Sequence, residues 1–115
     1  MPLARLSLRI DLKPDGRLGP GKIALLERID ATGSISAAGR AMGMSYRRAW
    51  QLVDSLNQCF RESVVTTSQG GAAGGGAALT PFGRGLIERY RAMERAATRA
   101  TARHLTALQE ARARR

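Results

Sequence analysis

The stretch from Ser34 to Phe60 constrains the fold more than any other part of the chain, because it reads as two helices joined by a tight turn. A first helix is predicted from about Ser36 to Met42, and Gly43 can adopt the left-handed conformation that ends a helix. Ser45 can cap a second helix through its hydroxyl group. Spacings of four and three residues place three apolar side chains on one face of this second helix: Ala49, Val53 and Leu56. The pattern is that of a helix-turn-helix, whose second helix enters the major groove of DNA.

The charge of the chain favours a polyanionic partner. Its 115 residues include 19 basic and 9 acidic side chains, which gives a net charge of +10, and all the basic residues except Lys13 and Lys22 are arginine. Arginine presents a rigid fork of donors that suits phosphate and the edge of guanine. A GC-rich coding sequence would also favour arginine over lysine, but it does not explain the positive sum.

The segment before the helix-turn-helix is predicted to support it. Residues 3–13 alternate between apolar and polar side chains, which is the period of a half-buried strand. Pro14, Asp15 and Gly16 are predicted to form a turn. An amphipathic helix then follows and ends at Thr32-Gly33, with these residues on its apolar face: Ile23, Leu25, Leu26 and Ile29.

Residues 64–80 are predicted to form a β-hairpin. Val64–Thr67 is a short strand rich in β-branched residues, and a glycine-rich tip leads to a second strand that ends near Thr80. A hairpin in this place is the wing of a winged helix, and a flexible linker between domains is the alternative. Thr80-Pro81 is a helix start, and its direct succession favours the wing.

One long helix is predicted from Pro81 to about Ala113, with fraying expected after about Glu110. Apolar and small residues recur on one of its faces at alternating spacings of four and three, as in a heptad seam. The members of this seam are Leu86, Tyr90, Met93, Ala97, Ala100, His104 and Leu108. A helix of this length cannot bury the whole seam against so small a core, so the seam is predicted to pair with a second subunit.

Together these elements predict a mainly α-helical chain with a small β-hairpin wing. A winged helix-turn-helix domain is expected over residues 1–80, with an N-terminal strand, a recognition helix at about 45–60 and a wing at about 64–80. A dimerisation helix is expected over residues 81–115.

The chain resembles the DNA-binding half of the ModE-type molybdate-dependent transcriptional regulators over about residues 18–95. The matching pieces are Thr32-Gly33-Ser34-Ile35-Ser36, Ser45-Tyr46, Ala49-Trp50, Asn57-Gln58, the glycine-rich tip with Ala78-Leu79-Thr80, Phe82-Gly83 and Leu86-Ile87. The architecture is also similar to the N-terminal domain of LysR-type regulators. The resemblance implies a sequence-specific regulator that binds double-stranded DNA.

The resemblance also bears on cofactors. Two-part members of the ModE family bind molybdate in a C-terminal module, for which these 115 residues offer no counterpart. No cofactor is therefore expected in this chain, while DNA binding as a homodimer to a pseudo-palindromic site is expected.

The expected DNA contacts lie on the helix-turn-helix and the wing. Arg47 is favoured for contact with guanine or phosphate, whereas Arg48 is as readily a solvated residue. Trp50 is placed either on the groove side or beneath the wing, and Arg40 is expected at the phosphate backbone. The wing tip has no Arg or Lys, so its grip is expected to be weak. The predicted set is Ser36, Arg40, Ser45, Tyr46, Arg47, Arg48, Trp50, Gln51, Thr67, Gly74 and Gly75.

No catalytic or metal-binding residue is predicted. Cys59 and His104 are the only residues of their types, and no cluster has metal-ligand spacing or the make-up of a nucleophile with its base. His104 is interpreted as an interface residue. The single cysteine favours a reducing cytoplasm, and no apolar run approaches the ~18 residues that a membrane span needs.

Two other functions stay open. The long helix could pair with a separate effector-sensing protein, which would make the chain a protein-interaction module. Alternatively, the chain could bind DNA without sequence preference, as nucleoid proteins do, whereas a regulator should discriminate by ~10³-fold or more.

Overall fold

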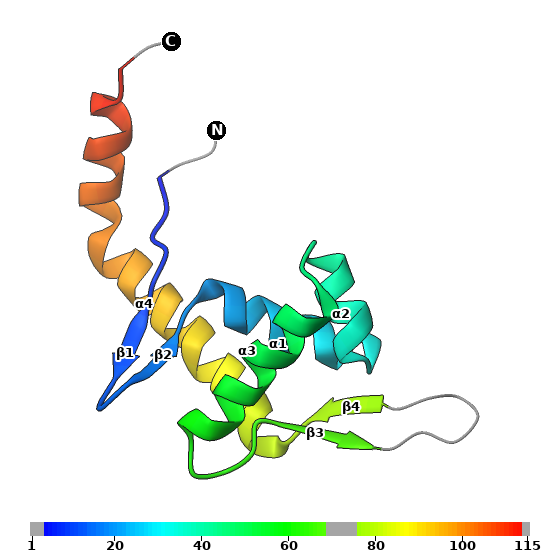
Figure 1. Ribbon diagram of the computed structural model, residues 1–115. Coiled ribbons are helices and arrows are strands. Elements are labelled where there is room, and N and C mark those ends of the chain that lie inside the picture. The colour runs from blue at the N-terminus through cyan, green and yellow to red at the C-terminus, as the bar shows by residue number, and fades with distance from the viewer. Residues whose placement is uncertain (1–3, 69–75, 114–115) are drawn as a thin grey trace.

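The computed structural model describes residues 4–68 and 76–113. In these residues the chain is mainly helical and carries two small antiparallel strand pairs (Figure 1). The elements in chain order are β1 Ile10–Leu12, β2 Gly16–Leu18, α1 Pro20–Thr32, α2 Ile35–Ala41, α3 Tyr46–Cys59, β3 Val65–Ser68, β4 Gly76–Leu79 and α4 Pro81–Ala111. The predicted helix-rich class with a small hairpin is confirmed.

The N-terminal segment differs from the prediction of a single strand over residues 3–13. Only β1 is a strand, and it pairs with β2 so that Ile10 lies opposite Leu18. The residues before β1 run beside α4, and the Tyr90 hydroxyl donates to the carbonyl oxygen of Leu8 at 2.6 Å, an acceptor that a neighbouring strand would otherwise use. The predicted alternation is nevertheless confirmed, because even-numbered side chains from 4 to 12 are half-buried and odd-numbered ones are exposed.

The predicted pair of helices around Gly43 is confirmed in detail. Ser34 caps α2, and the Ser45 hydroxyl oxygen caps α3 by accepting from the backbone N–H of Arg48 at 3.0 Å. Gly43 adopts a φ of 71°, in the left-handed region that favours glycine. A Cβ atom on Gly39 would lie 2.8 Å from the Cβ of Ala49, so α2 and α3 cross too closely for any larger residue at that position.

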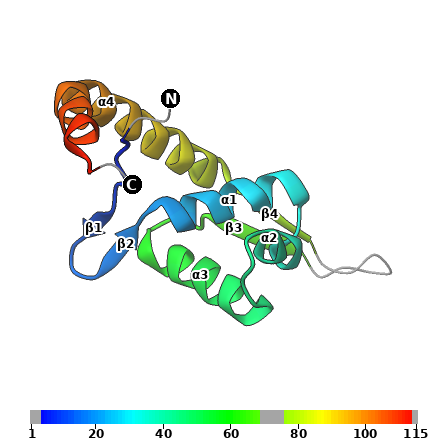
Figure 2. The ribbon, with the colours of Figure 1, turned by 90° about the horizontal axis from the view of Figure 1, so that it is seen from above.

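One hydrophobic core joins all the helices. α1 lies at its centre, between α3 on one side and the first half of α4 on the other (Figure 2). The buried apolar residues are Leu18, Ile23, Leu25, Leu26, Ile29, Ile35, Ala38, Ala49, Val53, Leu56, Val64, Val65, Leu79, Leu86 and Tyr90. No charged side chain in the described part of the chain is buried.

The β3–β4 hairpin is fastened to the helices by polar contacts. Asn57, near the end of α3, accepts through Oδ1 from the N–H groups of Val64 and Val65, and its Nδ2 donates to the carbonyl of Val65. At the other strand, the N–H of Ala77 donates to the carbonyl of Gly33, just after α1. The strands of the predicted wing are confirmed as a hairpin, and its tip lies outside the described residues.

Helix α4 begins where the sequence predicts and ends two residues earlier than expected. The Thr80 hydroxyl oxygen caps it by accepting from the N–H of Gly83, and Pro81 occupies the first turn. Its second half extends away from the rest of the domain (Figure 1). Over the ranges 4–68 and 76–113, no helix is both long enough and apolar enough to cross a membrane.

Candidate nucleic-acid interface

The first two turns of α3 carry a run of exposed side chains that includes most of the predicted DNA contacts. Ser45 and five residues of these turns are exposed: Tyr46, Arg47, Arg48, Trp50 and Gln51. Ala49 alone turns inward, where it packs with Val53 and Leu56 in the core. The sequence fixes this division because apolar residues recur on only one side of the helix. The α3 helix therefore lies on the outer face of the domain with its polar side uncovered (Figures 1 and 2).

Tyr46 and Trp50 form an aromatic pair on this face. Their ring centroids are 6.1 Å apart in an edge-to-face arrangement, and the side chains are 61% and 37% exposed. Arg47, Gln51 and Asp54 complete the lining of an open hollow of about 580 Å³ beside them. Of the two placements considered for Trp50, the structure supports the exposed one on α3. Large aromatic surface left in water marks a binding face more often than chance exposure does.

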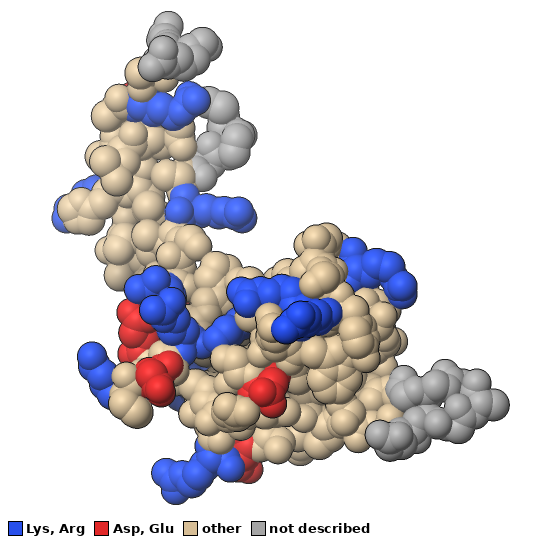
Figure 3. Space-filling model, viewed as in Figure 1, with Lys and Arg blue, Asp and Glu red and all other residues tan. Residues whose placement is uncertain are grey.

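The two arginines of α3 point to different neighbours. Arg47 lines the hollow beside the aromatic pair, whereas Arg48 lines a second hollow between α3 and the start of α1. Neither forms an ion pair with an acidic residue within the described ranges. Both guanidinium groups are thus available to an anion. Figure 3 shows basic side chains gathered across the middle of the face that carries α3.

The remaining predicted DNA contacts lie around α3 with unequal exposure. Arg40 is exposed in the last turn of α2, and Ser36 is half-buried near the start of that helix. Thr67 is exposed on β3. Gly74 and Gly75 lie outside the described residues. The structure brings the α3 residues together on one face and leaves Ser36 and Thr67 at its margins.

The seam predicted on α4 divides into two parts. Leu86 and Tyr90 are buried in the chain's own core, which corrects their assignment to an interface between subunits. The heptad spacing misled here because the first turns of a helix bury the same stripe against their own domain. Farther along α4, Met93 and Leu108 are 42% and 67% exposed. Ala97 is half-buried, and Ala100 and His104 are exposed.

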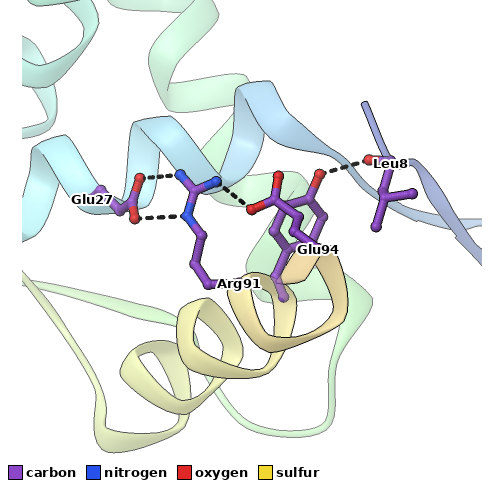
Figure 4. Close-up of polar contacts among 5 residues, drawn as sticks. Leu8, Glu27, Arg91 and Glu94 are labelled. Atoms are coloured by element: carbon purple, nitrogen blue, oxygen red, sulfur yellow. Dashed lines mark hydrogen bonds and ion pairs between the residues drawn. The ribbon is translucent and has the colours of Figure 1, made fainter. Parts of the chain in front are cut away.

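An ion-pair cluster that sequence reasoning missed joins α4 to α1 (Figure 4). The guanidinium of Arg91 donates to both carboxylate oxygens of Glu27, at 2.5 and 3.1 Å, and to Glu94 at 2.7 Å. Hydrogen bonds to Glu27 and Glu94 raise the pKa of Arg91. The pKa of Tyr90 is also raised, first by burial and then by the negative charge of Glu94. Glu27 and Arg91 are 64 positions apart, so no local pattern connects them.

The described residues offer no constellation for metal or acid–base chemistry. No group of three or more His, Cys, Asp or Glu side chains within residues 4–68 and 76–113 could hold a metal ion. Arg91 and its carboxylate partners link α4 to α1. The exposed face of α3 carries hydrogen-bond donors and aromatic rings.

Three relatives illustrate what the chain is similar to. It is 48% identical over 78 residues to the molybdenum-pterin-binding protein MopB of Rhodobacter capsulatus, which is 68% of this chain and 29% of that protein. It is 40% identical over 92 residues to the molybdenum transport protein ModE of Azotobacter vinelandii, or 80% and 33% of the two chains. It is 34% identical over 87 residues to the DNA-binding transcriptional dual regulator ModE of Escherichia coli (strain K12), or 76% and 33%.

The chain thus spans about a third of the length of these curated relatives. No protein-family model matches it.

Proposed function

We propose that the chain is the winged-helix DNA-binding part of a ModE-type transcriptional regulator, with no enzymatic activity of its own. The observation that carries this proposal is the uncovered side of α3, where a tyrosine, a tryptophan, two arginines and a glutamine stand together. The similarity to proteins named as ModE regulators supports the same conclusion. In this proposal α3 is the recognition helix and the β3–β4 hairpin is the wing.

Each exposed side chain of α3 has a chemistry that suits a base or a phosphate. Arg47 can donate two hydrogen bonds to the acceptors of guanine, and Gln51 can pair with adenine in the same way. Tyr46 and Trp50 offer apolar surface to the methyl group of thymine. Ser45 accepts the capping bond from Arg48, so its hydroxyl hydrogen remains for a phosphate oxygen.

The wing should add little to affinity. The strands β3 and β4 contain no lysine or arginine, and Thr67 is an exposed hydroxyl without charge. Phosphate contacts by basic side chains supply most of the salt-dependent affinity of DNA-binding proteins. Recognition therefore depends on α3 and on a second copy of it.

We propose that the second copy is brought by the far half of α4. Ala97, Ala100, His104 and Leu108 lie along one side of this half, and Met93 continues the same stripe just before it. Met93 and Leu108 are large apolar side chains that are exposed. Pairing of two such helices would form a homodimer. Its two α3 helices would then enter successive major grooves, about 34 Å apart, on a pseudo-palindromic site.

We assign no molybdate site to this chain. The names of its relatives associate molybdenum with proteins of which the match to this chain covers about a third. We therefore expect molybdate to leave DNA binding by the chain unchanged.

The proposal is tested by selecting genomic fragments with the purified chain at physiological salt, with and without molybdate. An enriched motif with two related half-sites is expected, together with discrimination of ~10³-fold or more over other DNA. Arg47→Ala should weaken binding to the selected site by about 10- to 100-fold and relax preference at one base pair. Arg28→Ala, an equal loss of charge at an exposed site on α1, is the control. Binding without any preferred motif would instead identify a nonspecific binder.

A second candidate function rests on the exposed Met93 and Leu108. In this alternative α4 pairs with a separate effector-sensing protein, and α3 is not required. Met93→Glu combined with Ala97→Glu would then abolish function, while Arg47→Ala would leave it intact. If the DNA-binding proposal is right, Arg47→Ala weakens binding and relaxes preference at one base pair, whatever α4 contacts.

A further inference from the structure

A basic groove lies beside the exposed face of α3 and extends beyond the helix-turn-helix to the β1–β2 hairpin and the start of α1. It is a hollow of about 630 Å³ between the β1–β2 hairpin, the first turn of α1 and α3. Four cationic side chains line it, from three separate parts of the chain, and no carboxylate does: Arg9, Arg17, Lys22 and Arg48. Gln51 and Ser55 of α3 complete its polar lining. Gln51 also lines the hollow beside Tyr46 and Trp50, so the two surfaces are continuous.

The hairpin and helix hold these cations in place. Lys22 donates through Nζ to the carbonyl of Arg17 at 3.0 Å and to the Ser55 hydroxyl at 3.4 Å, which positions its ammonium group between the hairpin and α3. An ammonium group has three donors, so one remains free for an anion. The stem of Arg9 lies over Gly19, at the start of α1.

Acidic side chains neutralise little of the positive charge of the groove. Asp11 faces Arg17 across the strand pair, but its carboxylate forms an ion pair with Arg9 at 3.1 Å. None of the ion pairs found among the described residues includes Arg17, Lys22 or Arg48. The first turn of α1 contains no acidic residue and no side-chain cap, so nothing there competes with an incoming anion. Counting Asp11, the four cations leave three positive charges at the groove.

We propose that this groove binds the phosphodiester backbone of the DNA that flanks the bases read by α3. The inference rests on the proposed function and extends it to residues outside the helix-turn-helix. The groove is continuous with the exposed face of α3, is lined by four cations and extends along α3. Its shape and positive charge match a run of backbone phosphates. Arg9, Arg17, Lys22 and Arg48 thus fix the position of α3 in the major groove, while Arg47 and Gln51 read sequence.

The test is the salt dependence of DNA binding by Arg17→Ala/Lys22→Ala. Each lost phosphate contact should reduce the slope of log K against log salt by about 0.9, so the double variant should lose close to ~2 from the slope. The same relation gives about 60-fold weaker binding at ~0.1 M salt, converging with the wild type near ~1 M. Arg28→Ala/Arg89→Ala removes equal charge at exposed sites outside the groove and should change the slope far less. Sequence preference should be retained in both double variants.

The outcomes separate the two proposals. A groove variant whose slope equals that of the wild type overturns the groove, even if Arg47→Ala still relaxes preference at one base pair and so supports the recognition role of α3. Loss of sequence preference by the wild type itself would overturn the proposed function, while a reduced slope in the groove variant would still support phosphate binding. Thermal unfolding monitored by circular dichroism checks that each variant is folded.

A free oxyanion such as inorganic phosphate could bind the same cations as a backbone phosphate of DNA. Titration with inorganic phosphate, followed by the amide NMR signals of Gly21 and Lys22, should show no saturation at millimolar concentrations. Saturable binding at those amides would assign the groove to a small anion and overturn its assignment to DNA.

Discussion

Gly83 provides a sharp test of how α4 is joined to the rest of the domain. It lies buried in the first turn of α4, where a Cβ atom would meet the backbone carbonyl of Val64. That carbonyl also accepts a hydrogen bond of 3.0 Å from the N–H of Thr80, the residue that caps the helix. The close approach of two backbones is possible only because residue 83 has no side chain. Gly83→Ala is therefore expected to destabilise the fold.

The size of the effect follows from three contributions. Overpacking against a backbone atom costs about 1–3 kcal/mol, and displacement of Val64 weakens a hydrogen bond that contributes about 1 kcal/mol. Alanine improves helix propensity by about 1 kcal/mol. The net loss is about 1–3 kcal/mol, which lowers the melting temperature by about 4–12 °C in a chain of this size.

Gly85 is the matched control, two residues farther along the same helix. It is exposed, and a Cβ atom there would meet nothing within 4 Å. Gly85→Ala should therefore stabilise the chain by about 0.5–1 kcal/mol through helix propensity alone. Thermal and urea unfolding monitored at 222 nm measure both variants. Equal or increased stability of Gly83→Ala would refute the close approach of α4 to Val64.

Two further predictions concern the polar contacts that fasten the outer elements. Asn57→Ala should lower the free energy of unfolding by about 2–4 kcal/mol, because three hydrogen bonds to the start of β3 are lost. Gln58→Ala, which loses one exposed contact, should have little effect in the same urea titration. Burial raises the pKa of Tyr90 in the folded chain above its value of about 10 in the unfolded chain. The stability contributed by the neutral phenol is therefore complete below about pH 10 and is lost as pH rises through the pKa of the folded chain. Melting temperatures measured from pH 9 to 12 should therefore fall less steeply for Tyr90→Phe than for the wild type.

The parts of the fold that sequence predicted best depend on local signals. Ser45 as a cap and Gly43 as the left-handed residue follow from neighbouring residues, and the structure confirms both. The start of α4 at Thr80-Pro81 is predictable for the same reason. Such signals extend over one or two turns of chain, so they locate elements without showing how distant ones meet.

The errors arose where distant segments compete for the same groups. The β2 strand was missed because its three residues carry no strand pattern and form only by pairing with β1. Tyr90 fits a subunit seam by spacing, yet the N-terminal segment and α1 cover it within one chain. The groove at Arg17 and Lys22 was also missed, since nothing in the sequence connects a hairpin, a helix start and Arg48 on α3.

Helix α4 extends away from the domain beyond the Arg91–Glu27 ion pair, so a change of its angle at this contact would move its far end the most. The 21 residues from Arg91 to Ala111 span about 30 Å of helix. A tilt of α4 by about 10° at Arg91 would therefore displace the far end of the helix by about 5 Å, which exceeds the rise of one base pair. In the proposed dimer, a change in this angle would change the distance between the two α3 helices. If the proposed dimer forms, a change at the Arg91–Glu27 contact would therefore change the half-site spacing that the protein can accept.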